Sequence, residues 1–260
     1  MTKHAILSAS GAHRWMNCTP SARLELEFED SSGEAAKEGT AAHELGEHKL
    51  RTALKIPTEK PTSVYDSEEM ERYTDEYVQF IFEELAAVKQ VTKDPLLLIE
   101  QRLDFSNYVP EGFGTGDCVI VADDVVHVID FKYGQGVLVE AENNPQMMLY
   151  ALGALNLFDA IYDINSVKMT IYQPRRENIS TFEIAKTDLI EWAENTLKPK
   201  AELAFNGEGE YKPGDWCRFC RASAECRARA EENLKVAKFE FKKPPLLTDD
   251  EIAEVLLHVN

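Results

Sequence analysis

An aspartate and a lysine stand at the end of a segment that the sequence predicts to be a buried β-strand. Residues 127–132 read His-Val-Ile-Asp-Phe-Lys, so Asp130 and Lys132 are two positions apart and their side chains point to the same face of a strand. Burial of a carboxylate or an ammonium group is unfavourable unless the charge is paired or coordinates a metal. Asp130 and Lys132 are therefore the first candidates for catalysis or metal binding.

A second aspartate is expected to face Asp130 across a hairpin. Residues 114–132 predict two strands joined by a turn at Asp123 and Asp124, and counting outward from this turn pairs Asp117 with Asp130. Directly opposed residues of antiparallel strands have Cβ atoms roughly 4.5–5.5 Å apart. Valines share the face of the two aspartates, and isoleucine and phenylalanine line the other face. Both strands are therefore predicted to lie in the centre of a sheet.

These acids suggest either a metal site or a structural ion pair. Two carboxylates at this separation repel each other, and one of them would take up a proton. A divalent cation removes the conflict and prefers such oxygen ligands. Glu100, on the preceding predicted strand, can supply a third carboxylate, and Lys132 can hold an attacking water or stabilise a developing oxyanion. The alternative is a salt bridge between Lys132 and one of the aspartates, with Glu100 exposed.

The last three of the five cysteines have a spacing that predicts metal ligation. Cys217, Cys220 and Cys226 form a C-x2-C-x5-C pattern, and Cys18 lies far away near the N-terminus. A structural disulfide is improbable in a cytosolic chain. Four thiolates suit zinc or an iron–sulfur cluster, and the spacing does not decide between the two. Cys118 lies within a predicted strand and is expected to be a small core residue.

The composition restricts the partners and the compartment. The 260 residues are 44% hydrophobic and 28% charged, with neither a membrane-spanning run nor a signal segment, so we expect a cytoplasmic protein that does not bind membranes. The formal net charge of −18 argues against nucleic acid as a partner unless a local basic patch opposes it. One basic stretch follows the cysteines and is either a phosphate-binding surface or a charge balance for an anionic cluster; it contains Arg218, Arg221, Arg227 and Arg229.

The predicted elements alternate between helices and strands. A helix carrying Trp15 comes first, and a helix from about Thr40 to Leu54 is predicted to be capped by Thr40 after a loop. An amphipathic helix is predicted over 67–90, followed by one strand over 95–105 and two strands over 115–134. A helix over 143–158 has Pro145 in its first turn. Two strands, over 167–175 and 179–185, and a helix over 186–205 come next. A last helix is predicted to begin at Thr248 and to stop without a cap. The pattern predicts an α/β fold with a mixed sheet and helices on both faces.

The order of three motifs resembles that of the PD-(D/E)xK nuclease superfamily, in particular its RecB-like branch. The motifs are Gly116-Asp117, then Asp130-Phe131-Lys132, then Gln146-x-x-x-Tyr150. The resemblance implies a restriction-endonuclease-like core in which Asp117, Asp130, Glu100 and Lys132 form a Mg²⁺- or Mn²⁺-dependent phosphodiesterase site. It also implies that Gln146 and Tyr150 border the DNA and orient the site, and that His43 is a metal-ligating helical histidine.

The cysteine pattern resembles the iron–sulfur staple of AddB-type and CRISPR-associated RecB-like exonucleases. The sequence resembles this branch from about residue 5 to residue 230. Within the branch, it is most similar to a group of phage and prophage proteins. The resemblance implies a [4Fe–4S] cluster, with zinc as the alternative, at Cys18, Cys217, Cys220 and Cys226, and DNA contacts by the four arginines.

We therefore expect a single nuclease domain over residues 1–240, with a core at about 95–200. An iron–sulfur staple is expected at residue 18 and residues 217–226. Residues 241–260 are expected to form a tail or the start of a further helix that the end of the chain cuts short. The expected activity is metal-dependent hydrolysis of DNA, by an exonuclease rather than an endonuclease, in phage recombination or repair in the host cytoplasm. A phage single-strand annealing or recombination protein is an expected partner. The alternatives are a non-catalytic DNA-binding or assembly module and a zinc-stapled protein whose acids are structural.

Overall fold

The computed structural model describes residues 5–29, 33–240 and 247–256, and its contacts divide the chain into two compact units. The sheet unit consists of Met1–Ala12 and Ser31–Pro199. The cysteine unit consists of His13–Asp30 and Lys200–Asn260. The single nuclease domain expected over residues 1–240, with its core at about 95–200, stays a prediction; the five strands of the sheet unit lie between Leu96 and Ala185.

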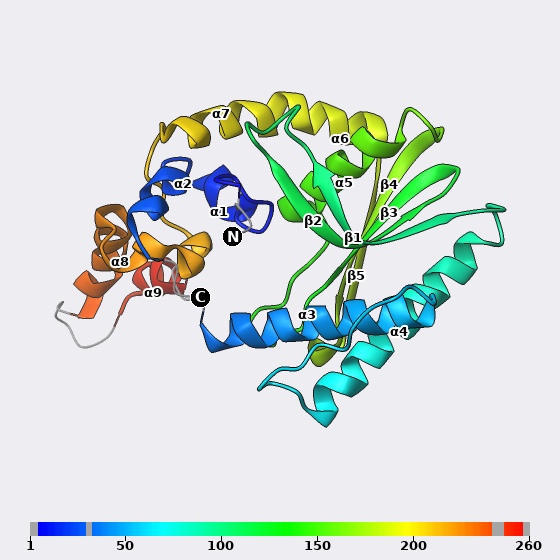
Figure 1. Cartoon of the computed structure of the whole chain (residues 1–260). Helices are drawn as coiled ribbons and strands as arrows, with labels where there is room; N and C mark the ends of the chain where they lie inside the picture. Colours follow the sequence, from blue (N-terminus) through cyan, green and yellow to red (C-terminus); the bar gives the residue numbers. More distant parts are fainter. Residues whose placement is uncertain (1–4, 30–32, 241–246, 257–260) are drawn as a thin grey trace. The chain divides into compact units, whose positions relative to one another are not determined.

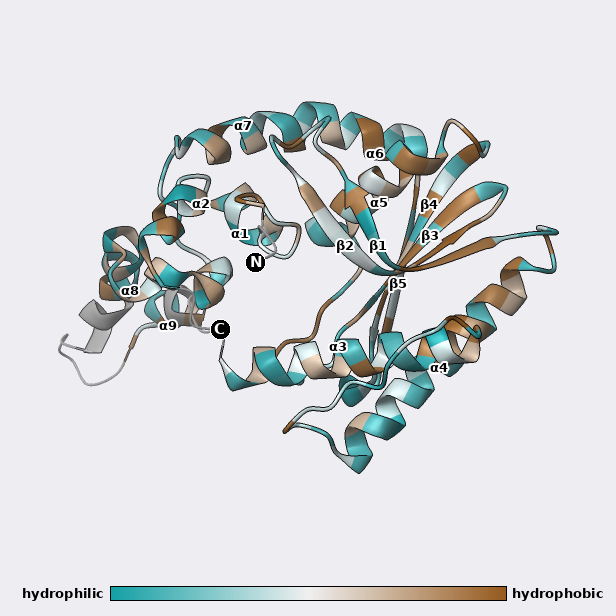
Figure 2. Cartoon of the chain, in the orientation of Figure 1, coloured by the Kyte–Doolittle hydropathy of each residue, from teal (hydrophilic) through white to brown (hydrophobic). Residues whose placement is uncertain are grey.

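The sheet unit contains one five-stranded mixed sheet, shown in Figure 1. Its order is β1-β2-β3-β4-β5, and only β3 and β4 are parallel neighbours. The strands are β1 (Leu96–Asp104), β2 (Phe113–Val121), β3 (Asp124–Phe131), β4 (Ile164–Gln173) and β5 (Asn178–Ala185). All five lie where the sequence predicted them. The buried runs are Cys118–Val121 of β2 and Val126–Phe131 of β3, and Figure 2 shows much of β3 in brown.

Helices cover both faces of this sheet, so the predicted α/β class, a central mixed sheet flanked by helices, is confirmed. On one face, α3 (Glu34–Ala53) and α4 (Glu68–Val88) pack against an apolar cluster that includes Cys118, Ile129 and Phe131. On the other face, the largely buried helix α5 (Pro145–Phe158) packs across β1 to β4. This arrangement agrees with the α/β core expected for a restriction-endonuclease-like fold.

The start of α3 corrects one prediction. The helix begins at Glu34 after Gly33, whereas we placed residues 33–39 in a loop and Thr40 at the N-cap. Thr40 lies inside the helix, and its hydroxyl donates to the carbonyl of Ala36 at 3.1 Å. Alanine, glutamate and lysine between residues 34 and 38 are strong helix formers, and they outweighed the capping signal of the threonine.

The helical segment that follows β5 contains a π-turn that the sequence pattern did not show. The predicted helix over residues 186–205 consists of α6 (Lys186–Trp192), a π-turn over Ala193–Leu197 and α7 (Lys198–Asn206). Pro199 follows the π-turn, and proline lacks the N–H that a regular helix needs and crowds the preceding turn. The wider turn before Pro199 accommodates this defect.

The cysteine unit joins both ends of the chain. It contains α1 (Ala12–Asn17), α2 (Ser21–Leu24), the 3-10 segments Asp215–Phe219 and Arg221–Ala224, α8 (Arg227–Glu240) and α9 (Asp249–Leu256). The hydroxyl of Thr19 donates to the carbonyl of Glu208 at 2.6 Å. Thr248 and Glu251 exchange backbone and side-chain hydrogen bonds at the start of α9, which confirms the predicted start of the last helix. Its predicted uncapped end lies outside the described residues.

The described helices include none that is long and apolar enough to cross a membrane.

Candidate active site

The hairpin of β2 and β3 has the predicted register as far as the pair before Asp117 and Asp130. Cys118 pairs with Ile129 and Val121 with Val126, which is the register counted outward from the predicted turn. Asp124 closes the turn with a left-handed φ of 75°. Asp117 and Asp130 are the next residues on the two strands after the pair Cys118–Ile129, which is where the sequence predicted them.

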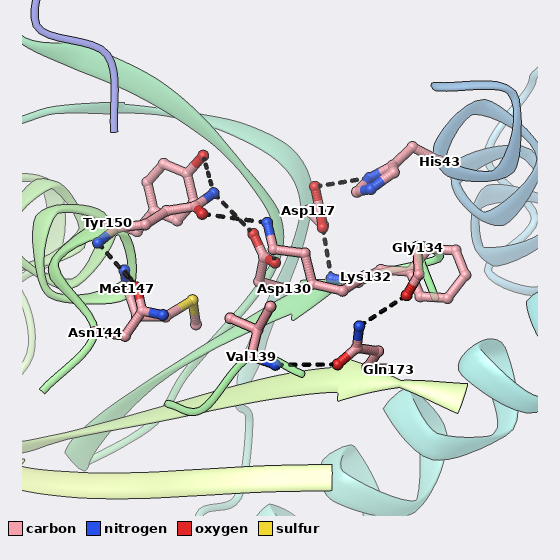
Figure 3. Close-up of polar contacts among 12 residues, drawn as sticks. His43, Asp117, Asp130, Lys132, Gly134, Val139, Asn144, Met147, Tyr150 and Gln173 are labelled. Carbon is pink, nitrogen blue, oxygen red and sulfur yellow. Dashed lines mark hydrogen bonds and ion pairs between the residues drawn. The ribbon is translucent and has the colours of Figure 1, made fainter. Parts of the chain in front are cut away.

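Asp117 is held between a strand and a helix, as Figure 3 shows. Its Oδ2 accepts a hydrogen bond from the backbone N–H of Phe131 at 2.7 Å, and its Oδ1 lies 3.3 Å from Nδ1 of His43 on α3. Burial alone would raise the pKa of Asp117, but the charges of His43 and Lys132 outweigh burial and hold the pKa below its usual value. Asp117 is therefore ionised at neutral pH.

Asp130 and Lys132 form a polar network with α5. Lys132 Nζ lies 2.8 Å from Oδ2 of Asp130 and donates to Oε1 of Gln146 at 3.2 Å. The Gln146 amide donates to Oδ1 of Asp130 at 3.3 Å and to the hydroxyl of Tyr150 at 3.2 Å. Asn144 caps the helix by accepting from the N–H of Gln146, which fixes the first turn of α5 beside the strand. Gln146 of the predicted Gln-x-x-x-Tyr motif is thus hydrogen-bonded to both Asp130 and Lys132.

The buried Oδ2 of Asp130 has the Lys132 ammonium group as its ion-pair partner. Its Oδ2 is close to Lys132 but accepts no hydrogen bond of ordinary geometry from the described residues. Burial raises the pKa of Asp130, and the attraction of Lys132 only partly opposes this. A buried carboxylate oxygen whose only close partner is an ammonium group can also bind a metal cation.

Glu100 reaches the site because the backbone of β1 is irregular there. It stands opposite Asp117 between the pairs Ile99–Cys118 and Gln101–Gly116, with a left-handed φ of 50°. Ile99 packs against the α3 and α4 cluster, whereas Leu103 lies against Gly153 of α5. Residues four apart share a face in a regular strand, so the alternation of faces is broken between Ile99 and Leu103. A left-handed glutamate within a strand is costly and is typical of functional sites.

Three of the four predicted metal ligands come together. Ligand atoms of His43, Glu100 and Asp117 all lie within 4.8 Å of one another. Asp130 is outside this group, and Lys132 and Gln146 contact its carboxylate, so its role as a fourth ligand stays a prediction. Two carboxylates and an imidazole are a donor set that fits a divalent cation, and Asp130 lies on the neighbouring strand.

The pKa values of Glu100 and His43 are both raised. Burial and the charge of Asp117 raise the pKa of Glu100 to about 7. Burial works to lower the pKa of His43, but the Asp117 carboxylate outweighs it and raises that pKa to about 9. At neutral pH His43 is therefore an imidazolium paired with Asp117, and it must lose its proton before it can bind a metal.

We expect the affinity for Mn²⁺ to rise with pH. Below about pH 7, binding displaces protons from both Glu100 and His43, so the logarithm of the affinity is expected to gain up to about two units per pH unit. Between pH 7 and 9 only His43 releases a proton, and the slope is expected to fall to about one. Calorimetric titration from pH 6 to 8.5 measures this slope, and His43→Gln is expected to flatten its upper part. An affinity that does not change with pH would contradict the assignment of these ligands.

The sequence did not single out two further residues near these ligands. Glu47 of α3 and Tyr77 of α4 line the same small pocket as His43, Glu100 and Asp117. The ring of Tyr77 stacks on Phe131 at 4.6 Å, and its buried hydroxyl has no hydrogen-bond partner among the described residues. Tyr77 lies in the amphipathic helix predicted over residues 67–90, where its spacing indicated only a buried apolar position. The sequence pattern did not indicate a role for its hydroxyl.

The four predicted cluster ligands line one pocket of the cysteine unit. Cys18, Cys217, Cys220 and Cys226 surround it together with Trp216. Among the described residues, no three of these Sγ atoms lie within 4.8 Å of one another, whereas four thiolates on one zinc ion would be roughly 3.8 Å apart, given Zn–S bonds of about 2.3 Å. Cys118 is fully buried in the α3 and α4 cluster, as predicted for a core residue.

The predicted DNA-binding arginines differ in exposure. Arg218, Arg221 and Arg227 are exposed, whereas Arg229 is half-buried and donates to the carbonyl of Ser223 at 3.0 Å. Arg229 therefore has a structural contact that competes with a role in binding. The sequence also gave no sign of Glu25, a buried acid that pairs with Arg14 and accepts from the N–H of Arg221 at 2.7 Å.

Comparison with known proteins gives a family and a solved structure. A family model described as a protein of unknown function, DUF2800, matches residues 4–260. A crystal structure of SSO0001 is similar at 16% sequence identity and a TM-score of 0.32, over 71% of this chain and 95% of that chain. The family match covers both units of the chain.

Proposed function

The chain belongs to the DUF2800 family of proteins of unknown function, and from the geometry of its site we propose that it is a metal-dependent deoxyribonuclease. The observation that carries the proposal is the convergence of His43, Glu100 and Asp117 beside the Asp130–Lys132 pair. The motif series of the sequence points to DNA as the substrate and to an exonuclease. Phosphodiester hydrolysis needs a site that neutralises the scissile phosphate and activates water, and these residues can provide both.

A divalent cation would be held by His43, Glu100 and Asp117, and Asp130 is a further candidate ligand. Such a cation would lower the pKa of a bound water and offset the charge of the scissile phosphate. Lys132 contributes a fixed positive charge. Burial works to lower the pKa of Lys132, but the carboxylates of Asp130 and Asp117 raise it overall, so the side chain stays protonated at neutral pH. Lys132 therefore acts as a donor that orients water or stabilises a developing oxyanion, and not as a base.

Gln146 orients Lys132 and Asp130 at the same time. Its amide oxygen accepts from Lys132, and its amide nitrogen donates to Asp130 and Tyr150. These contacts restrict the ammonium and the carboxylate to one arrangement, which is the positioning that a reacting phosphate requires.

We also propose that the cysteine unit holds a [4Fe–4S] cluster at Cys18, Cys217, Cys220 and Cys226. The shared pocket supports a common ligand of the four cysteines. Such a cluster would join the two ends of the chain. The proposed setting is the cytoplasm of a phage-infected cell, with a phage annealing or recombination protein as partner.

A cleavage assay with three DNA substrates tests the proposed activity. Linear single-stranded, linear double-stranded and circular DNA are incubated with Mg²⁺, Mn²⁺, Ca²⁺ or excess EDTA. Degradation of linear DNA with Mg²⁺ or Mn²⁺ is expected, Ca²⁺ is expected to bind without turnover, and circular DNA is expected to resist an exonuclease. Binding of DNA without cleavage under all conditions would favour a non-catalytic DNA-binding module instead.

A further inference from the structure

The loop that follows Lys132 presents apolar side chains to solvent. It joins the end of β3 to the start of α5, and residues 134–138 are all exposed. Val137 and Leu138 have 37% and 48% of their surface exposed. Residues 132–139 contain no acid in a chain with 46 acidic residues, and the nearest acids in the sequence are the site residue Asp130 and Glu140. An acid-free, partly apolar loop beside the site differs from the rest of this surface.

A buried glutamine makes hydrogen bonds to the backbone of this loop, as Figure 3 shows for Gln173 with Gly134 and Val139. Gln173, at the end of β4, is only 1% exposed. Its Nε2 donates to the carbonyls of Gly134 and Val137, both at 2.8 Å, and its Oε1 accepts from the N–H of Val139 at 3.2 Å. The side chain therefore satisfies backbone groups at both ends of the exposed segment, which fixes the path of the loop.

Further contacts from the β4–β5 hairpin complete the support. Asn178 donates to the carbonyl of Val139 at 2.9 Å, and Ser180 accepts from the N–H of Ala141 at 2.9 Å. Arg176 is exposed and donates to the carbonyl of Gln135 at 3.0 Å. A guanidinium has five N–H donors, so this bond leaves most of them available for an anionic ligand. The loop thus carries an exposed cation at its flank and Lys132 at its start.

We propose that residues 134–138 and Arg176 form the surface that contacts the DNA strand whose phosphate enters the site, and that Gln173 is the positioning residue of this surface. The proposal deepens the proposed function and depends on DNA being the ligand. The loop is continuous with Lys132, its glycines allow close approach of a sugar–phosphate backbone, and Arg176 can pair with a phosphate. Val137 and Leu138 can pack against exposed bases. A loop that is already fixed loses little entropy on binding.

Binding of a labelled single-stranded oligonucleotide, measured by anisotropy in Ca²⁺, tests the contact. Leu138→Asp is expected to weaken binding about tenfold or more, whereas Leu157→Asp, at an exposed leucine near the end of α5, is its control and is expected to change binding less than twofold. Arg176→Gln is expected to weaken binding and to lower the slope of log affinity against log salt by about one unit. Arg72→Gln, at an exposed arginine of α4, makes the same change of charge and is expected to leave the slope unchanged.

A double-mutant cycle tests the role of Gln173. Gln173→Leu is expected to raise amide exchange within residues 134–141 and to weaken binding, with KM rising more than kcat falls. If Gln173 acts through the loop, Gln173→Leu and Leu138→Asp together are expected to weaken binding by less than the product of their separate effects. Separate effects that multiply fully would show that Gln173 is merely structural.

The outcomes separate this proposal from the proposed activity. If the protein never cleaves DNA but the loop variants weaken binding, the contact stands and the nuclease assignment falls. If the protein cleaves DNA and the variants bind like their controls, the nuclease assignment stands and the loop serves another partner. Absence of DNA binding by the unmodified protein would overturn the contact as well.

Discussion

An Asp130→Asn variant is expected to lose at least about a thousandfold in DNA cleavage, which is the scale of removing a principal electrostatic group from an active site. Asparagine has the shape of aspartate, but it leaves Lys132 without the carboxylate that lies 2.8 Å away. The proposed site would then lack both the charge of Asp130 and the fixed position of the ammonium group. Initial rates on linear DNA in Mn²⁺ measure the effect.

The same variant is expected to remain folded. Burial raises the pKa of Asp130 in the folded protein, so its charged form is disfavoured there, and a neutral amide removes that cost. The unfolding temperature of the metal-free protein is therefore expected to stay the same or rise. Asp124→Asn is the matched control on the same strand, because asparagine accepts the left-handed φ of 75° at this exposed turn. Equal cleavage by the two variants would place the reaction elsewhere.

The second large effect is expected at Cys18. Cys18→Ser is expected to lose the iron and the visible absorbance of the purified protein, because the cluster would lack one of its four thiolates. A loss of about 2 kcal/mol would lower the unfolding midpoint of a unit of this size by roughly 8–16 °C. Amide exchange is expected to rise in residues 13–30 and 200–229, while Mn²⁺ binding by the sheet unit is retained. Iron content, absorbance and exchange are measured on anaerobically purified protein.

Cys118→Ser is the control, because Cys118 is also buried but lies in the sheet unit. This variant is expected to keep its iron and to lose only the stability of a core position. Iron content that is unchanged by Cys18→Ser would contradict the staple between the two ends of the chain, and stoichiometric zinc in place of iron would contradict the cluster type.

The features that the sequence predicted depend on short-range rules. The β2–β3 register follows from the alternation of faces and the position of the Asp123–Asp124 turn, so counting was sufficient to oppose Asp117 and Asp130. The face shared by Gln146 and Tyr150 follows in the same way from helical spacing. These rules involve neighbours in one hairpin or one helix, and tertiary packing did not override them.

The features that the sequence did not predict depend on contacts between distant segments. The left-handed backbone of Glu100 turns its side chain toward His43, and no residue pattern within β1 indicates this irregularity. Gln173 looked like an ordinary strand residue, because its three partners lie in a loop more than thirty positions earlier. The separation of Asp130 from the metal-binding group also depends on Lys132 and Gln146 competing for its oxygens.

Mn²⁺ binding and DNA cleavage measured over the same range of Mn²⁺ concentration test the central claim most directly. In the unmodified protein, half-maximal cleavage is expected at the concentration that half-fills the site, with no cleavage in excess EDTA. Glu100→Gln removes one ligand charge and is expected to move both curves to higher Mn²⁺ by the same factor. Cleavage that persists in EDTA, or a cleavage curve that stays in place while binding weakens, would contradict a metal-dependent nuclease site at His43, Glu100 and Asp117.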